Sequence, residues 1–162
     1  QYAHERGVTV EAELGHVGAH DGSAENHGPG GHSIYTDPAQ AKEYAEATGV
    51  DALAVAIGTA HGAYKSKPKL DFDRLTELHA ALPVPLVLHG GSGLSDDDFR
   101  RSIACGISKV NIFTDLCLAG NAAMTDGLAA GEAYLTIRNR KVDYIKRAVM
   151  EKMSLFGSVG KA

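Results

Sequence analysis

The stretch Asp51-Ala52-Leu53-Ala54-Val55-Ala56-Ile57-Gly58-Thr59-Ala60-His61-Gly62 indicates the fold class of this chain. Its apolar run, residues 52–57, ends at a glycine, and a short bounded run of this kind is typical of a buried strand. A helical segment over residues 37–48 precedes the strand, with proline at its first position and Gly49 just past its last. A second helical segment follows over residues 72–82, so the strand lies between two helices.

This alternation of strand and helix continues along the chain. Short apolar or β-branched runs predict further strands at residues 8–14, 86–89 and 109–113. Capping residues and apolar spacing predict further helices at residues 96–105 and 142–156. Strands that alternate with helices are parallel and are joined by right-handed crossovers, so the predicted class is α/β.

An open doubly wound sheet and a (β/α)8 TIM barrel both fit this pattern. A TIM barrel needs eight units and typically about 250 residues, whereas this chain has 162 residues. We therefore expect residues 1–162 to be the C-terminal part of a single barrel domain, carrying roughly its last four βα units without the N-terminal strands. The glycine- and histidine-rich residues 15–36 are expected to form a mobile loop.

The composition excludes several classes of protein. With 44% hydrophobic and 22% charged residues, the chain is neither disordered nor collagen-like. A net charge of −4 gives no basic surface for a nucleic acid or an anionic membrane, and the longest apolar run is too short to cross a bilayer. Two cysteines, Cys105 and Cys117, cannot form a disulfide framework, which indicates a reducing cytoplasm.

Polar residues follow two of the predicted strands at the point where each strand ends. His61 follows the strand at residues 52–57, and His89 ends the next strand along the chain. Since neighbouring strands lie about 4.8 Å apart, the two imidazoles could converge on one ion, and imidazole suits Zn²⁺. The alternative is that each histidine is a hydrogen-bonded residue of the sheet edge, but the surrounding glycines favour a site.

The residues after His89 are candidates for binding phosphate. Glycines in the segment 90–93 permit close approach of the backbone to a ligand, and successive N–H groups of such a turn can hold an anion. A plain turn between a strand and a helix is the alternative. Asn111 and Thr114, at the next strand end, favour the phosphate site because barrels often bind phosphate after their last strands.

Two other groups of residues are candidates for chemistry. Glu11 and Glu13 alternate with apolar residues and therefore lie on one face of the first strand, where they would need a metal or an ionic partner. The insertion over residues 16–32 contains His16, His20, His27 and His32. A second metal site is one interpretation of these histidines, and a mobile lid is the favoured one, because no regular spacing presents them to a single ion.

Four motifs in order resemble the zinc-dependent class II ketose-bisphosphate aldolases, which include fructose- and tagatose-bisphosphate aldolases. The motifs are Val-Glu-Ala-Glu-Leu-Gly at residues 10–15, residues 49–62, the segment 84–93, and Lys-Val-Asn-Ile at residues 109–112. The ending Phe156-Gly157-Ser158 is also similar to the C-terminus of the family. The resemblance extends over nearly the whole chain and implies a TIM barrel.

The resemblance also implies the site residues. It makes His61, His89 and Glu13 ligands of Zn²⁺, and it leaves room for a monovalent cation. It places the substrate phosphate at Gly62, Gly90, Gly91, Ser92, Asn111 and Thr114. Members usually carry an acid/base glutamate in the loop, where this chain has Asp21, with Glu25 nearby, and the role stays open between these two residues. A third zinc histidine and a proton-handling aspartate belong to earlier strands, so this chain alone is expected to be inactive.

The implied reaction is reversible aldol cleavage of a ketose 1,6-bisphosphate, with fructose 1,6-bisphosphate as the first choice. The products would be dihydroxyacetone phosphate and glyceraldehyde 3-phosphate, as in glycolysis. Alternatives are a tagatose-bisphosphate or inositol-catabolism sugar-phosphate aldolase, or a non-catalytic half-barrel that binds sugar phosphate. The expected partner is a small sugar phosphate, with no nucleic acid and no membrane, in a cytoplasmic homodimer or homotetramer.

Overall fold

The computed structural model describes residues 1–16, 35–62, 64 and 68–161. Most of the predicted loop at residues 15–36, including Asp21 and Glu25, lies outside these described residues. The chain forms two compact units, Gln1–Asn111 and Ile112–Ala162. No helix within the described part of the chain is both long and apolar enough to span a membrane.

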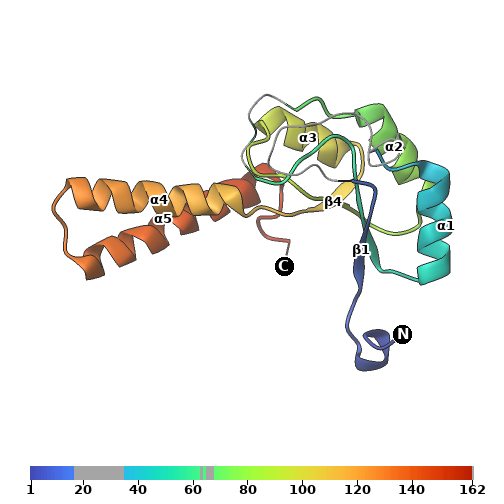
Figure 1. The fold of residues 1–162 in the computed structure, drawn as a ribbon, viewed down its shortest axis with the longest axis horizontal. Coiled ribbons are helices and arrows are strands. Elements are labelled where there is room, and N and C mark those ends of the chain that lie inside the picture. The colour runs from blue at the N-terminus through green and yellow to red at the C-terminus, as the bar shows by residue number, and fades with distance from the viewer. Residues whose placement is uncertain (17–34, 63, 65–67, 162) are drawn as a thin grey trace. The chain divides into compact units, whose positions relative to one another are not determined.

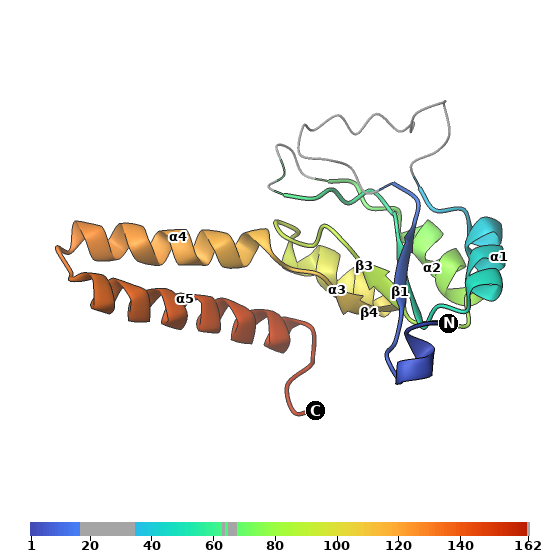
Figure 2. The same cartoon turned by 60° about the horizontal axis from the view of Figure 1, so that its bottom comes forward.

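The first unit is a parallel α/β sheet with its strands in chain order, β1-β2-β3-β4 (Figures 1 and 2). The strands are β1 (Glu11–Leu14), β2 (Ala52–Val55), β3 (Leu86–Leu88) and β4 (Ile107–Val110). The helices are α1 (Pro38–Thr48), α2 (Phe72–Ala81) and α3 (Asp96–Ala104), and a short 3-10 helix, η1 (His4–Arg6), precedes the sheet. This topology confirms the predicted α/β class.

The helices begin and end where their capping residues indicate. The carboxylate of Asp37 accepts hydrogen bonds from two backbone N–H groups of the first turn of α1, and Gly49 ends that helix at a φ of 65°. Helix α3 begins with a capping box: the Ser95 hydroxyl accepts from the Asp98 N–H, and the Asp98 carboxylate accepts from the Ser95 N–H. Local sequence therefore determines both helices.

The core lies between the sheet and these helices. Along β2 and its extension, Leu53, Val55 and Ile57 are completely buried, as are Leu75 of α2 and Phe99 of α3. Alternate residues of a strand point to opposite faces, so Leu53, Val55 and Ile57 share the face that the helices cover. The opposite face of the sheet is thereby left for the polar side chains.

Several strands are shorter than predicted or shifted. The strand expected at residues 8–14 begins only at Glu11, because the N–H of Val10 donates instead to the carboxylate of Asp51, 2.6 Å away. This bond, with a further one from His4, holds the pKa of Asp51 below its ordinary value. The strand expected at residues 109–113 is β4, which begins with the buried Ile107; its polar residues obscured the strand pattern.

The second unit is an antiparallel pair of helices, α4 (Thr114–Ala129) and α5 (Tyr134–Leu155). The sequence indicated only residues 142–156 of α5 and did not indicate α4. The residues that precede the two helices, Phe113 and Ala133, provide no side-chain cap, and α4 contains Gly120 and Gly127, which weaken a helical pattern. At Gly127 a Cβ would lie 2.7 Å from Ile137, so the glycine permits close contact of the two helices.

Candidate metal site

One row of side chains crosses the inner face of the sheet, which is the face that the helices leave uncovered. The strand register aligns Glu13 of β1 with Ala54 of β2, Ala54 with Val87 of β3, and Val87 with Lys109 of β4. Side chains two positions along a strand share its face, so Glu11 belongs to this face, as do His89 and Asn111 just beyond their strands. The sequence placed both glutamates on one face, as the structure confirms.

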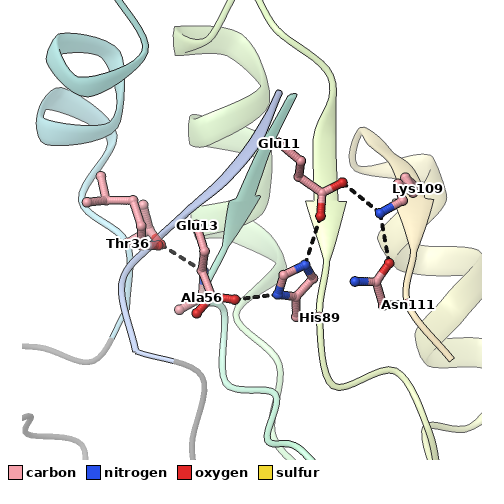
Figure 3. A network of polar contacts seen from close by, with 8 residues as sticks. Glu11, Glu13, Thr36, Ala56, His89, Lys109 and Asn111 are labelled. Carbon is pink, nitrogen blue, oxygen red and sulfur yellow. Dashed lines mark hydrogen bonds and ion pairs between the residues drawn. The ribbon is translucent and has the colours of Figure 1, made fainter. Parts of the chain in front are cut away.

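Small residues of β2 let the glutamates reach across the sheet. Glu11 is aligned with Ala52, and Glu13 with Ala54. The methyl groups of these alanines project only slightly from the sheet. Both glutamate side chains therefore extend past β2 to His89 at the end of β3 (Figure 3). In β2 the larger residues therefore pack on the helix-covered face, and the alanines that alternate with them leave the polar face open.

The sheet curves toward this polar face. The Lys109 ammonium on β4 donates a 2.6 Å hydrogen bond to Oε2 of Glu11 on β1, although these are the two outer strands. In a flat sheet the outer strands would lie roughly 14 Å apart, with their side chains projecting away from the sheet. Contact between them indicates a curved sheet such as the wall of a barrel.

His89 lies between two carboxylates (Figure 3). Its Nδ1 hydrogen bonds with Oε2 of Glu13, and its Nε2 lies 3.1 Å from Oε1 of Glu11. A neutral imidazole carries one N–H and cannot donate to both carboxylates, so when Nε2–H is donated to Glu11, the Nδ1 lone pair is left to bind an ion together with Glu13. A carboxylate that holds the second nitrogen of a histidine in this way is a common feature of metal sites.

His61 completes a group with metal-binding character. The ring centroids of His61 and His89 are 6.1 Å apart, and ligand atoms of Glu13, His61 and His89 all lie within 4.8 Å of one another. Two imidazole nitrogens and one carboxylate oxygen are a donor set found in catalytic zinc sites, which keep a further position for water or substrate. The residues present therefore fit a zinc ion, and the structure brings together all three predicted ligands.

Glu11 lies outside the group of three candidate ligands and contacts His89 and Lys109. Partial burial alone would raise the pKa of Glu11, but the hydrogen bonds from Lys109 and His89 outweigh this effect and hold the pKa below its ordinary value. The carboxylate is thus ionised at neutral pH and accepts the imidazole N–H. Sequence reasoning found Glu11 but not its partner Lys109, whose placement on the same face follows from the register of β4.

Most of the predicted phosphate-binding residues lie in the first unit. Gly90, Gly91 and Ser92 form the turn after β3, and Ser92 is only 6% exposed. Oδ1 of Asn111 accepts a 2.9 Å hydrogen bond from Lys109, so Asn111 joins the polar network of Figure 3. Gly62 directly follows His61, while Thr114 is the first residue of α4 in the second unit. Asp21 and Glu25 lie outside the described residues.

Two known proteins are similar to this chain over nearly its whole length. The uncharacterized protein YdjI of Escherichia coli K12 is 47% identical over 161 residues, covering 99% of this chain and 56% of YdjI. A fructose-bisphosphate aldolase of Geobacillus stearothermophilus is 41% identical over 167 residues, covering all of this chain and 56% of that enzyme. The chain thus spans just over half the length of these relatives.

The fold is also that of solved aldolases. The crystal structure of the YdjI aldolase from Escherichia coli K12 matches with a TM-score of 0.83 and 42% identity, over 99% of this chain and 54% of that one. This coverage, together with the curved four-stranded sheet, agrees with the predicted partial barrel. The family model described as class-II fructose-bisphosphate aldolase matches residues 1–161, and the chain therefore belongs to the class II fructose-bisphosphate aldolase family.

Proposed function

We propose that the protein carrying this chain is a zinc-dependent lyase that reversibly cleaves a ketose 1,6-bisphosphate. The first-choice substrate is fructose 1,6-bisphosphate, which would give dihydroxyacetone phosphate and glyceraldehyde 3-phosphate. The observation that supports this proposal most strongly is the convergence of Glu13, His61 and His89 at one edge of the sheet, in a chain of the aldolase family. The name of the Geobacillus relative is consistent with this substrate.

Three residues of this chain would hold the metal, and one would orient a ligand. Glu13, His61 and His89 offer a carboxylate oxygen and two imidazole nitrogens. When bound, zinc would act as a Lewis acid on the ketone carbonyl of the substrate. Glu11 would keep the Nε2–H of His89 engaged, so that Nδ1 faces the ion, and Lys109 would hold Glu11 in place.

The phosphate and the proton would be handled by neighbouring segments. The buried turn at residues 90–92 would bind the phosphate through backbone N–H groups, and Gly90 has a left-handed φ of 66° that suits an anion-binding turn. Binding the phosphate there would position the reacting carbons near His61 and His89. We assign the proton transfer to a loop carboxylate, either Asp21 or Glu25.

Removal and return of the metal tests this proposal. We expect the full-length protein to lose nearly all aldolase activity on dialysis against a chelator and to regain it with stoichiometric Zn²⁺, because the carbonyl then recovers its Lewis acid. The measurement is dihydroxyacetone phosphate release from fructose 1,6-bisphosphate and, in parallel, from tagatose 1,6-bisphosphate. Undiminished cleavage by protein shown to be free of metal would contradict zinc dependence. Cleavage of tagatose 1,6-bisphosphate alone would overturn only the choice of substrate.

A further inference from the structure

Tyr64 makes two hydrogen bonds that link the segments carrying the two candidate histidine ligands. Its hydroxyl accepts a 3.0 Å hydrogen bond from the backbone N–H of Ala60, the residue before His61. The same hydroxyl donates a 2.7 Å hydrogen bond to the backbone carbonyl of Gly90, the residue after His89. One oxygen atom therefore connects the neighbours of both imidazoles, which lie in segments separated by more than twenty residues along the chain.

The two segments are in close contact at this point. A Cβ on Gly90 would lie 2.5 Å from the carbonyl oxygen of Ala60, so the backbones approach as closely as glycine allows. The ring of Tyr64 lies against Gly93 of the same turn, where a Cβ would be 3.1 Å from Cδ2 of the ring. The phenol thus packs along the turn after β3 as well as bonding to it.

The protonation state of the Tyr64 hydroxyl also suits this pair of hydrogen bonds. Burial raises the pKa of Tyr64 above its ordinary value, so the phenol stays protonated and keeps its donor at neutral pH. A protonated phenol can donate one hydrogen bond and accept another at the same time, as it does here. A phenylalanine would keep the ring packing and lose both bonds, so the contribution of the oxygen atom can be measured by itself.

We infer that Tyr64 is a positioning residue, whose hydroxyl joins the turn after β2 to the turn after β3 and thereby sets the spacing of His61 and His89. This inference rests on the proposed metal site, because it concerns the geometry of two of its ligands. Without the oxygen, the Ala60 N–H and the Gly90 carbonyl lose their shared partner, and the two turns can separate. An ion that requires both imidazoles then binds less tightly.

The matched experiment compares Tyr64→Phe with Tyr44→Phe, which removes the same atom from helix α1. We expect Tyr64→Phe to weaken zinc binding about tenfold or more, the range found when a residue supporting a metal ligand is removed. The Tyr44→Phe control should leave zinc affinity unchanged. Affinity is measured on the full-length protein by competition with a chromogenic chelator, and the visible spectrum of the Co²⁺ form should change in Tyr64→Phe alone.

A second readout does not depend on metal. Amide hydrogen exchange at Ala60 should accelerate in metal-free Tyr64→Phe, because its N–H has lost its acceptor. Unchanged exchange at Ala60, or unchanged zinc affinity with faster exchange, would overturn the positioning role while leaving the proposed function intact. Conversely, a parent protein with metal-independent aldolase activity would defeat the proposed function, and faster exchange at Ala60 would still uphold the link between the two turns.

Discussion

Replacement of His89 by alanine is expected to weaken zinc binding by at least about 100-fold and to abolish aldolase activity. Loss of a residue that merely supports a metal ligand costs about 10- to 100-fold in affinity, so loss of a ligand should cost more. His89 also separates the carboxylates of Glu11 and Glu13, and without it these like charges face each other, while the Lys109 ammonium still pairs with Glu11 in the network of Figure 3. The measurement is zinc affinity by chelator competition, together with turnover of fructose 1,6-bisphosphate.

Two variants serve as controls for this prediction. His4→Ala removes a histidine that also pairs with a carboxylate, Asp51 at 2.8 Å, but at the amino end of the strands, and it should leave metal binding unchanged. Glu11→Gln keeps the shape of the side chain that supports His89 and should give an intermediate loss of about tenfold. Equal zinc affinity in His89→Ala and the parent protein would remove His89 from the site.

Replacement of Gly90 by alanine is expected to lower both the stability of the protein and its affinity for zinc. The residue has a left-handed φ of 66°, and its Cβ would lie 2.5 Å from a backbone oxygen of Ala60. The conformation alone costs roughly 1–2 kcal/mol for a residue with a side chain, and overpacking typically adds about 1–3 kcal/mol. Because the new methyl group pushes apart the turns that carry His61 and His89, zinc affinity should fall together with stability.

Gly49→Ala separates the two causes. Gly49 has nearly the same φ, 65°, at the end of α1, but a Cβ there would have no heavy atom within 4 Å. We therefore expect Gly49→Ala to cost only the conformational part, about 1 kcal/mol, with unchanged zinc affinity. Urea denaturation and chelator competition measure the two effects. Equal destabilisation by both substitutions would show that the contact between Gly90 and Ala60 carries no weight.

Local patterns in the sequence were sufficient to predict the four strands and the helices α1 to α3 of the first unit, although several strand boundaries differ. Asp37-Pro38 and Gly49 bound α1 as expected, and the apolar run after Asp51 forms the central strand β2. Helix α4 could not be predicted, because its glycines disfavour a helix in isolation and become favourable only when α5 packs against them. Its existence depends on contacts that a local pattern does not contain.

The candidate site could be predicted only in part, because some of its contacts join segments that are distant along the chain. His61 and His89 could be paired because they follow two neighbouring parallel strands, whose carboxyl ends meet at one edge of the sheet. The contact of Glu11 with Lys109 depends on the curvature of the sheet, and the role of Tyr64 depends on the close approach of two turns. Spacing along the chain shows neither feature, although the alanines of β2 are a sequence signal for an open inner face.

The most direct test of the metal site is a crystal structure of the zinc-loaded full-length protein, with anomalous diffraction measured on both sides of the zinc absorption edge. The proposal predicts a zinc-specific peak within bonding distance, about 2.0–2.2 Å, of Nδ1 of His89, a ring nitrogen of His61 and a carboxylate oxygen of Glu13. A zinc peak that is bonded to other residues, with His61 and His89 free of metal, would contradict it.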